Sequence, residues 1–237
     1  MAALDHATGV VLGQIAVDTK SNEIPAAKDL LAAFDTDDLQ RSVITVDAMH
    51  TQTDTAELIL EAGADYVFTV KANQPKLLAA LKKLPWAKMS TRSQVTERGH
   101  GRRVTRTIKV AQAPAWIGFP TLAQVAQVRR TVTRQGKNSV EVVYLITSAD
   151  YHNAPPATLA SWIQGHWRIE NPLHWVRDVT YDQDRSQVRT GSAPHVMASL
   201  GNTVIRLLRL TGCDNITAAQ QHHTRDPQGT VTWLPTY

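Results

Sequence analysis

The sequence predicts an α/β protein in which strand and helix units are followed by antiparallel hairpins. Up to Leu84, short β-branched runs alternate with stretches of good helix formers, which is typical of βαβ units around a parallel sheet. From about 94 to 149, β-branched and basic residues alternate around Gly99, Gly101 and Gly136. This second pattern is typical of hairpins, so we expect a β-rich segment inserted after the first α/β part.

The first predicted elements are a strand and a helix. Val10 to Val17 is an apolar, β-branched run that begins after Gly9 and indicates a strand. The helix that follows has Ser21 or Asn22 as its cap and an acid, Glu23, in its first turn.

Two further strand and helix pairs follow. The apolar run Val43 to Val46 predicts a strand that ends at Asp47, and TDTAELILEAG predicts a helix with Thr51 or Thr53 as its cap and Gly63 as its stop. DYVFTVKANQ predicts the next strand, and PKLLAALKKL predicts the helix after it.

Helices return after the hairpins. We expect one helix over 155–178 and an amphipathic one over 194–210. Pro172 lacks an amide hydrogen and disfavours helical geometry at Asn171, which predicts a kink just after Glu170. Residues 211–237 show no periodicity, so we expect a loosely ordered tail.

Composition excludes several classes of protein. Among 237 residues there is one cysteine, Cys213, which excludes an internal disulfide framework and a multi-cysteine zinc ribbon. No stretch has the roughly 18 uninterrupted apolar residues of a membrane span, and MAALDHATGV lacks the features of a signal peptide. We therefore expect a cytoplasmic protein with no membrane partner.

The basic residues are concentrated in the hairpin segment. The net charge is only +4, but between Arg92 and Arg134 a single acid, Glu97, stands among many cations. These cations are Arg98, Arg102, Arg103, Arg106, Lys109, Arg129 and Arg130. Such a surface favours a polyanion partner, although a solvated basic face without a ligand is the open alternative.

Polar side chains follow two of the predicted strands. Asp47 ends an apolar strand, at the sheet edge where ligands gather in α/β proteins, and the alternative is that it caps the next helix. Lys71, Asn73 and Gln74 follow the next strand, where they form either a phosphate-binding group or a simple polar loop.

Glu170 is the central acid of SWIQGHWRIENPLHWVRDVTYDQDRS. On a helix it shares a face with His166 and His174, four residues away on either side. Zinc held by all three is one hypothesis, but the two histidines are about 12 Å apart along the axis. A solvated or ion-paired acid is the second. In the third, Glu170 and Asp47 hold divalent metal ions for phosphoryl transfer. Spacing does not decide between the last two.

Several stretches, taken together and in order, resemble DDE-type insertion-sequence transposases of the H-repeat-associated group. They are TGVVLGQIAVDTKSNEIPA, VITVDAMHTQ, GADYVFTVKANQP, ERGHGRRVTR and GHWRIENPLHWVRDVTYDQDRSQVRTG. The resemblance implies an RNase H-like core, with a mixed sheet flanked by helices and a β-rich insertion between the second and third catalytic acids. It also implies strand cleavage and transfer that depend on Mg²⁺ or Mn²⁺.

The resemblance also assigns residues by position. Asp47 becomes the second catalytic acid and Glu170 the third, both as metal ligands. Double-stranded DNA, at the transposon ends and the target, becomes the expected partner, and a homodimer the expected assembly. The DNA-binding residues implied are Lys71, Asn73, Gln74, Arg98, Arg102, Arg103, Arg106, His166, Trp167 and Arg177. His166 and Trp167 are expected to support the third acid. Gln164 and Gln183 depart from residues common in relatives.

The first catalytic aspartate has no match here. The family carries it in an Asp-Gly-Lys context, and these three residues do not occur in succession anywhere in the chain. Asp5 matches a turn and Asp18 the end of a strand, so neither inherits the role. We therefore expect a fragment that lacks the first, central strand of the core and is inactive alone.

The resemblance also yields a predicted division of the chain. Residues 1–90 are expected to form the first part of the core, 91–150 the insertion, 151–210 the C-terminal helices and 211–237 the tail. Two other functions stay open: a non-catalytic DNA-binding fragment or regulator, and a zinc hydrolase that uses His166, Glu170 and His174.

Overall fold

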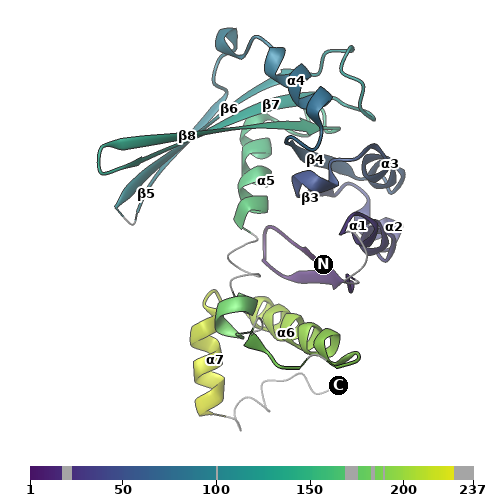
Figure 1. Cartoon of the computed structure of the whole chain (residues 1–237), viewed down its shortest axis with the longest axis vertical. Coiled ribbons are helices and arrows are strands. Elements are labelled where there is room, and N and C mark those ends of the chain that lie inside the picture. The colour runs from purple at the N-terminus through teal and green to yellow at the C-terminus, as the bar shows by residue number, and fades with distance from the viewer. Residues whose placement is uncertain (18–22, 100, 169–175, 183–184, 189, 227–237) are drawn as a thin grey trace. The chain divides into compact units, whose positions relative to one another are not determined.

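The computed structural model describes residues 1–17, 23–99, 101–168, 176–182, 185–188 and 190–226 (Figure 1). The chain divides into two compact units, one formed by Asn22–His166 and the other by Met1–Ser21 with Trp167–Tyr237. The larger unit contains a mixed sheet with helices packed on it, so the predicted mixed α/β fold is confirmed. The predicted domain boundaries, including the limits of the insertion, stay predictions.

The main sheet has six strands in the order β3-β4-β8-β7-β6-β5. Only β3 (Val43–Val46) and β4 (Asp65–Val70) run parallel, with Val46 opposite Phe68. The other pairs are antiparallel, as expected for hairpins: β5 (Ser93–Gly99), β6 (Arg102–Gln112), β7 (Gln124–Arg134) and β8 (Lys137–Thr147). The hairpin strands therefore continue the sheet that contains Asp47's strand, through the pairing of β8 with β4.

Helices α1 (Glu23–Ala32), α3 (Thr53–Glu61), α4 (Pro75–Lys83) and α5 (Pro156–Arg168) of the larger unit form in segments that the sequence predicts to be helical. The short α2 (Thr36–Leu39) and the 3₁₀ turns η1 (Ala48–His50) and η2 (Trp86–Lys88) were not predicted. Helix α3 ends where Gly63 takes a φ of +73°, so the predicted stop is confirmed. The predicted cap is wrong. Gln52 occupies the cap position, and the Thr51 hydroxyl donates instead to the Thr69 carbonyl at 2.7 Å.

The core lies against one face of the sheet. Tyr66, Phe68, Val125 and Ile146 share that face because cross-strand neighbours point the same way. They pack with Ala56 and Ile59 of α3, Leu81 of α4 and Trp86. The opposite face contacts α5, since Thr45 of β3 meets His166 of that helix.

The described part of the smaller unit includes a hairpin, a short π-helical segment over 176–180 and the helices α6 (Ala193–Leu210) and α7 (Ile216–Arg225). Strands β1 (Ala2–Leu4) and β2 (Val11–Gln14) pair with each other, so the strand predicted at 10–17 belongs to a separate two-stranded sheet. Val11 of β2 packs with Ile205 and Leu208 of α6 and with Ile216 of α7.

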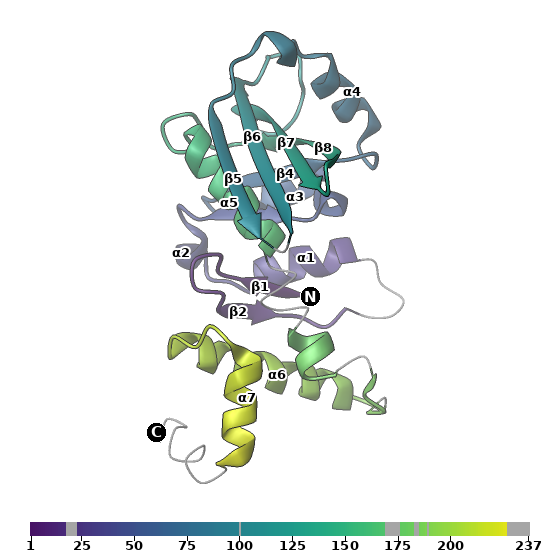
Figure 2. The ribbon, with the colours of Figure 1, turned by 90° about the vertical axis from the view of Figure 1, so that its left-hand side faces the viewer.

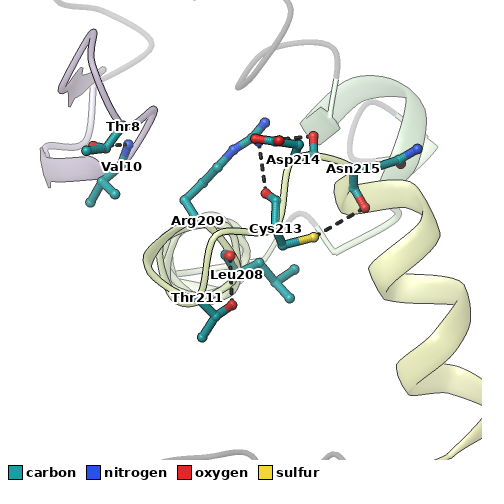
Figure 3. A network of polar contacts seen from close by, with 8 residues as sticks. All are labelled: Thr8, Val10, Leu208, Arg209, Thr211, Cys213, Asp214 and Asn215. Carbon is teal, nitrogen blue, oxygen red and sulfur yellow. Dashed lines mark hydrogen bonds and ion pairs between the residues drawn. The ribbon is translucent and has the colours of Figure 1, made fainter.

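The loosely ordered tail predicted for 211–237 is wrong for residues 216–225, which form α7. The side chain of Asn215 accepts a hydrogen bond from the Ala218 amide, which is a standard helix cap. Figure 3 shows the turn before this helix, where the Arg209 guanidinium donates to the carbonyls of Cys213 and Asp214, each at 3.0 Å. Sequence periodicity missed a helix that is short and largely polar.

Within the ranges that the structure describes, no helix combines the length and apolar character that crossing a membrane requires.

Candidate functional site

Asp47 lies at the carboxyl end of β3, immediately before the turn η1. Its backbone carbonyl accepts from the His50 amide at 2.9 Å, but its carboxylate makes no capping hydrogen bond. The side chain is 79% exposed. The capping alternative is therefore wrong for the carboxylate, which faces outward from the sheet edge.

His166 of α5 contacts both Asp47 and Thr45 of β3, the strand that Asp47 follows. The imidazole Nε2 lies 3.5 Å from Asp47 Oδ1, and Nδ1 lies 3.0 Å from Thr45 Oγ1. The ring itself is only 16% exposed. The contact with His166 lowers the pKa of Asp47 below its ordinary value, and the nearby His50 and Lys71 act in the same direction. Asp47 is therefore a carboxylate anion at neutral pH.

The loop after β4 braces the loop after β3. Asn73 Nδ2 donates to the Ala48 carbonyl at 2.6 Å, and Gln74 Nε2 donates to the Thr51 carbonyl at 2.7 Å. Because β3 and β4 are parallel, their carboxyl ends meet at one sheet edge, and these amides connect the two loops there. Both residues were predicted to contact DNA, and the structure gives them bonds within the protein. Lys71, at the start of the same loop, is exposed.

Glu170 and His174 lie outside the described residues, so neither the Asp47–Glu170 pair nor the zinc hypothesis has a geometry here. Helix α5 is described to Arg168, two residues before Glu170. Trp167 is partly buried in that helix, and Arg177 is partly buried in the smaller unit. Across the described residues, no group of three or more histidine, cysteine or acidic side chains could hold a metal ion.

Four of the five arginines predicted to bind DNA belong to the hairpins, and they divide between the two faces of the sheet. Arg98 is opposite Arg103, whereas Arg102 and Arg106 lie one residue out of phase with them and point to the other face. Arg106 Nη1 forms an ion pair with Glu97 Oε2 at 2.8 Å, and Glu97 Oε1 accepts from Gln164 of α5 at 2.9 Å. Arg106 is thus engaged within the protein, while Arg98, Arg102 and Arg103 are exposed.

The sequence did not reveal the contact between His166 and Asp47. The resemblance implied that His166 supports Glu170, and the spacing of four residues on one helix suggested only the zinc hypothesis. The structural partners of His166, Thr45 and Asp47, are about 120 positions away along the chain. No local pattern pairs residues at that separation.

The family model described as "Transposase DDE domain" matches residues 1–207. The chain belongs to this family. It is 34% identical over 222 residues to "Putative transposase YncI" of Escherichia coli O157:H7, covering 88% of this chain and 55% of that protein. It is 33% identical over 222 residues to "H repeat-associated putative transposase YhhI" of Escherichia coli (strain K12), covering 88% of this chain and 57% of the other. The predicted family is therefore confirmed.

This DDE-family chain spans a little over half the length of these curated relatives. Among solved structures, the piggyBac transposase synaptic complex with hairpin DNA aligns with 89% of this chain and 40% of that one, at 14% identity and a TM-score of 0.40. Membership of the family therefore comes from the sequence matches.

Proposed function

We propose that this chain supplies the second and third metal-binding acids, Asp47 and Glu170, of an insertion-sequence transposase, together with part of its DNA-binding surface. Membership of the DDE family supports this proposal. The observation that carries it is Asp47 itself, an exposed carboxylate held at the carboxyl end of β3 by His166 and kept anionic there.

The chemistry of Asp47 fits a hard divalent cation. Mg²⁺ in phosphoryl-transfer enzymes is held by one or two carboxylates, with water and substrate phosphates completing the shell. Oδ1 of Asp47 faces His166, and Oδ2 has no partner among the described residues. When bound, Mg²⁺ or Mn²⁺ would supply Lewis-acid stabilisation of phosphoryl oxygens. Asp47 and Glu170 would be the ligands, and His166 would orient Asp47.

Double-stranded DNA is the proposed substrate. Among the cations that the resemblance assigns to DNA, Arg98, Arg102 and Arg103 of the hairpins and Lys71 at the start of a loop are exposed, whereas Arg106 and Arg177 are partly buried. Because Asp-Gly-Lys is absent from the 237 residues, we expect the isolated chain to bind DNA without cleaving it.

A metal-binding titration tests the role of the acids. Mn²⁺ binding to the purified chain is followed by the loss of the free-ion resonance, for wild type, Asp47→Asn and Glu170→Gln. Each substitution is expected to weaken binding by roughly tenfold or more. Exposed acids provide matched controls, Asp38→Asn in α2 and Glu57→Gln in α3, and these should bind Mn²⁺ as wild type does. Unchanged binding in Asp47→Asn contradicts the proposal.

A non-catalytic DNA-binding fragment or regulator is the second candidate, favoured by the exposed arginines of the hairpins. It predicts salt-sensitive duplex binding that survives Asp47→Ala and Glu170→Ala, with no Mn²⁺ binding at these acids. Robust strand transfer by the 237-residue chain with Mg²⁺ would contradict both this candidate and the expected inactivity. Stoichiometric zinc in the purified protein would support the hydrolase alternative.

A further inference from the structure

The hairpins β5–β6 and β7–β8 end at the same point along the strand direction of the sheet. Gly99 of β5 is opposite Arg102 of β6, Arg102 is opposite Arg134 of β7, and Arg134 is opposite Lys137 of β8. The β7–β8 loop contains only Gln135 and Gly136, with φ of +49° and +74°, which is the geometry of a tight primed turn. The hairpin strands β5, β6, β7 and β8 therefore end together, and we call these four neighbouring strands the blade (Figure 2).

One face of this end has a row of three cations. Arg102, Arg134 and Lys137 are directly opposite one another on adjacent strands and are all exposed. No ion pair joins any of them to another described residue. Like charges directly opposite one another across strands repel, so this row costs stability unless an anion lies against it.

The other face has cations at the same level. Arg98 is opposite Arg103, and both are exposed and outside every ion pair between described residues. The acids of the blade are already engaged. Glu97 pairs with Arg106 at 2.8 Å, and Glu141 pairs with Arg130 at 3.6 Å. The end of the blade is therefore strongly positive on both faces.

We infer that the hairpin end of the blade enters a groove of duplex DNA. The row Arg102, Arg134 and Lys137 then faces the phosphates of one DNA strand, and Arg98 with Arg103 faces those of the other. The inference rests on the proposed function in taking DNA as the partner. It adds Arg134 and Lys137 to the contact surface, removes Arg106 from it, and assigns the two faces to opposite strands of the duplex.

The dimensions agree with this placement. A sheet with side chains on both faces is about 10 Å thick, and the major groove is about 12 Å wide and 8.5 Å deep. Arginine and lysine on either face would then reach the phosphates that border the groove. A single strand of DNA offers only one row of phosphates, so a two-faced grip prefers duplex.

The test measures binding of the full 237-residue chain to a labelled duplex of about 30 base pairs and to one of its strands, by fluorescence anisotropy in EDTA over a range of salt. One variant neutralises the first face, Arg102→Gln with Arg134→Gln and Lys137→Gln. A second neutralises the other face, Arg98→Gln with Arg103→Gln. The matched control removes three exposed lysines of α4, Lys76→Gln, Lys82→Gln and Lys83→Gln.

A plot of log K against log salt has a negative slope, and neutralising cations should make it less steep. The magnitude of the slope should fall by about two to three in the first-face variant and by about two in the second. Each should also reduce the preference for duplex over single strand, whereas Arg106→Gln and the α4 control should leave slope and preference nearly unchanged. Since all substituted positions of the two faces are exposed, circular dichroism should match wild type. Thermal unfolding should occur at the wild-type temperature or slightly above it, because each variant removes repulsion between cations that face one another across the strands.

An unchanged slope in either face variant overturns the two-faced grip while leaving the proposed function standing. If both face variants show the expected reduction in salt dependence but Asp47→Asn binds Mn²⁺ as wild type does, the proposed function is contradicted and the two-faced grip stands. A wild-type chain that binds no duplex contradicts this inference and DNA as the partner, whatever the metal titration shows.

Discussion

His166 Nε2 lies 3.5 Å from Asp47 Oδ1, so a helix residue of α5 orients the carboxylate that ends β3. The other ring nitrogen contacts Thr45, two residues before Asp47 in the same strand. A ring held at both nitrogens has little freedom to rotate, and its contact with Asp47 restricts that carboxylate in turn.

Removing the imidazole should weaken metal binding at Asp47. We expect His166→Ala to lower Mn²⁺ affinity about tenfold, because partners that orient a ligating carboxylate commonly contribute that much. His166→Gln keeps an amide donor near Asp47 and should retain part of the affinity. His152→Ala, at an exposed histidine, is the control and should leave the titration unchanged. Equal affinity in His166→Ala and wild type would show that the contact does not position Asp47.

Substitutions at Asn73 and Gln74 distinguish two roles for these side chains, which are stabilising the loop after β3 and contacting DNA. Because their amides bond to the carbonyls of Ala48 and Thr51, Asn73→Ala and Gln74→Ala should each lower the free energy of unfolding by about 1 kcal/mol. Urea denaturation measures this, with the exposed Gln94→Ala as control. If both variants keep wild-type stability but bind duplex DNA more weakly, the DNA contact implied by the resemblance is correct and the bracing role is minor.

His50 predicts a dependence of stability on pH. Burial lowers the pKa of this 4% exposed histidine below 6.5, against the opposing charges of Glu23 and Asp47. Below pH 6.5 the unfolded chain therefore binds a proton that the folded chain resists. The free energy of unfolding should fall as the pH drops below 6.5 and should level off once the folded histidine also titrates.

The pH effect of His50 is measured by comparison with a neutral variant. Urea denaturation of wild type and His50→Gln between about pH 7.5 and 5 should show a smaller decline in the variant, because only wild type gains the unfolded-state proton at this position. Since other groups titrate in both proteins, the difference between the two curves is the informative quantity. Parallel curves would rule out a contribution from His50.

Tyr66 should contribute through its hydroxyl as well as its ring. The side chain is fully buried, and its hydroxyl donates to the Pro120 carbonyl at 2.7 Å. Tyr66→Phe leaves that carbonyl without this donor and should cost about 1 kcal/mol of unfolding free energy. Tyr151→Phe, at a residue that is 63% exposed, should change stability by much less. Thermal or urea unfolding of the pair checks the difference.

Residue type and periodicity predicted the helices and strands that depend on interactions between residues close together in the sequence. The strand at Val43–Val46, the helix that ends before Gly63 and the alternating hairpins all follow from residue type and period. The tail helix was missed because its one clear local signal is the Asn215 cap, which periodicity does not register.

Only the tertiary structure decided how these elements meet. Strand register placed Arg102 on the face opposite Arg98 and brought Arg134 and Lys137 beside it, and a one-residue shift would have reversed that division. Packing of α5 on the sheet brought His166 to Asp47 across about 120 positions. Residue types and spacing supplied the candidate acids and cations, but partners and faces depend on contacts between distant segments, which the local sequence does not encode.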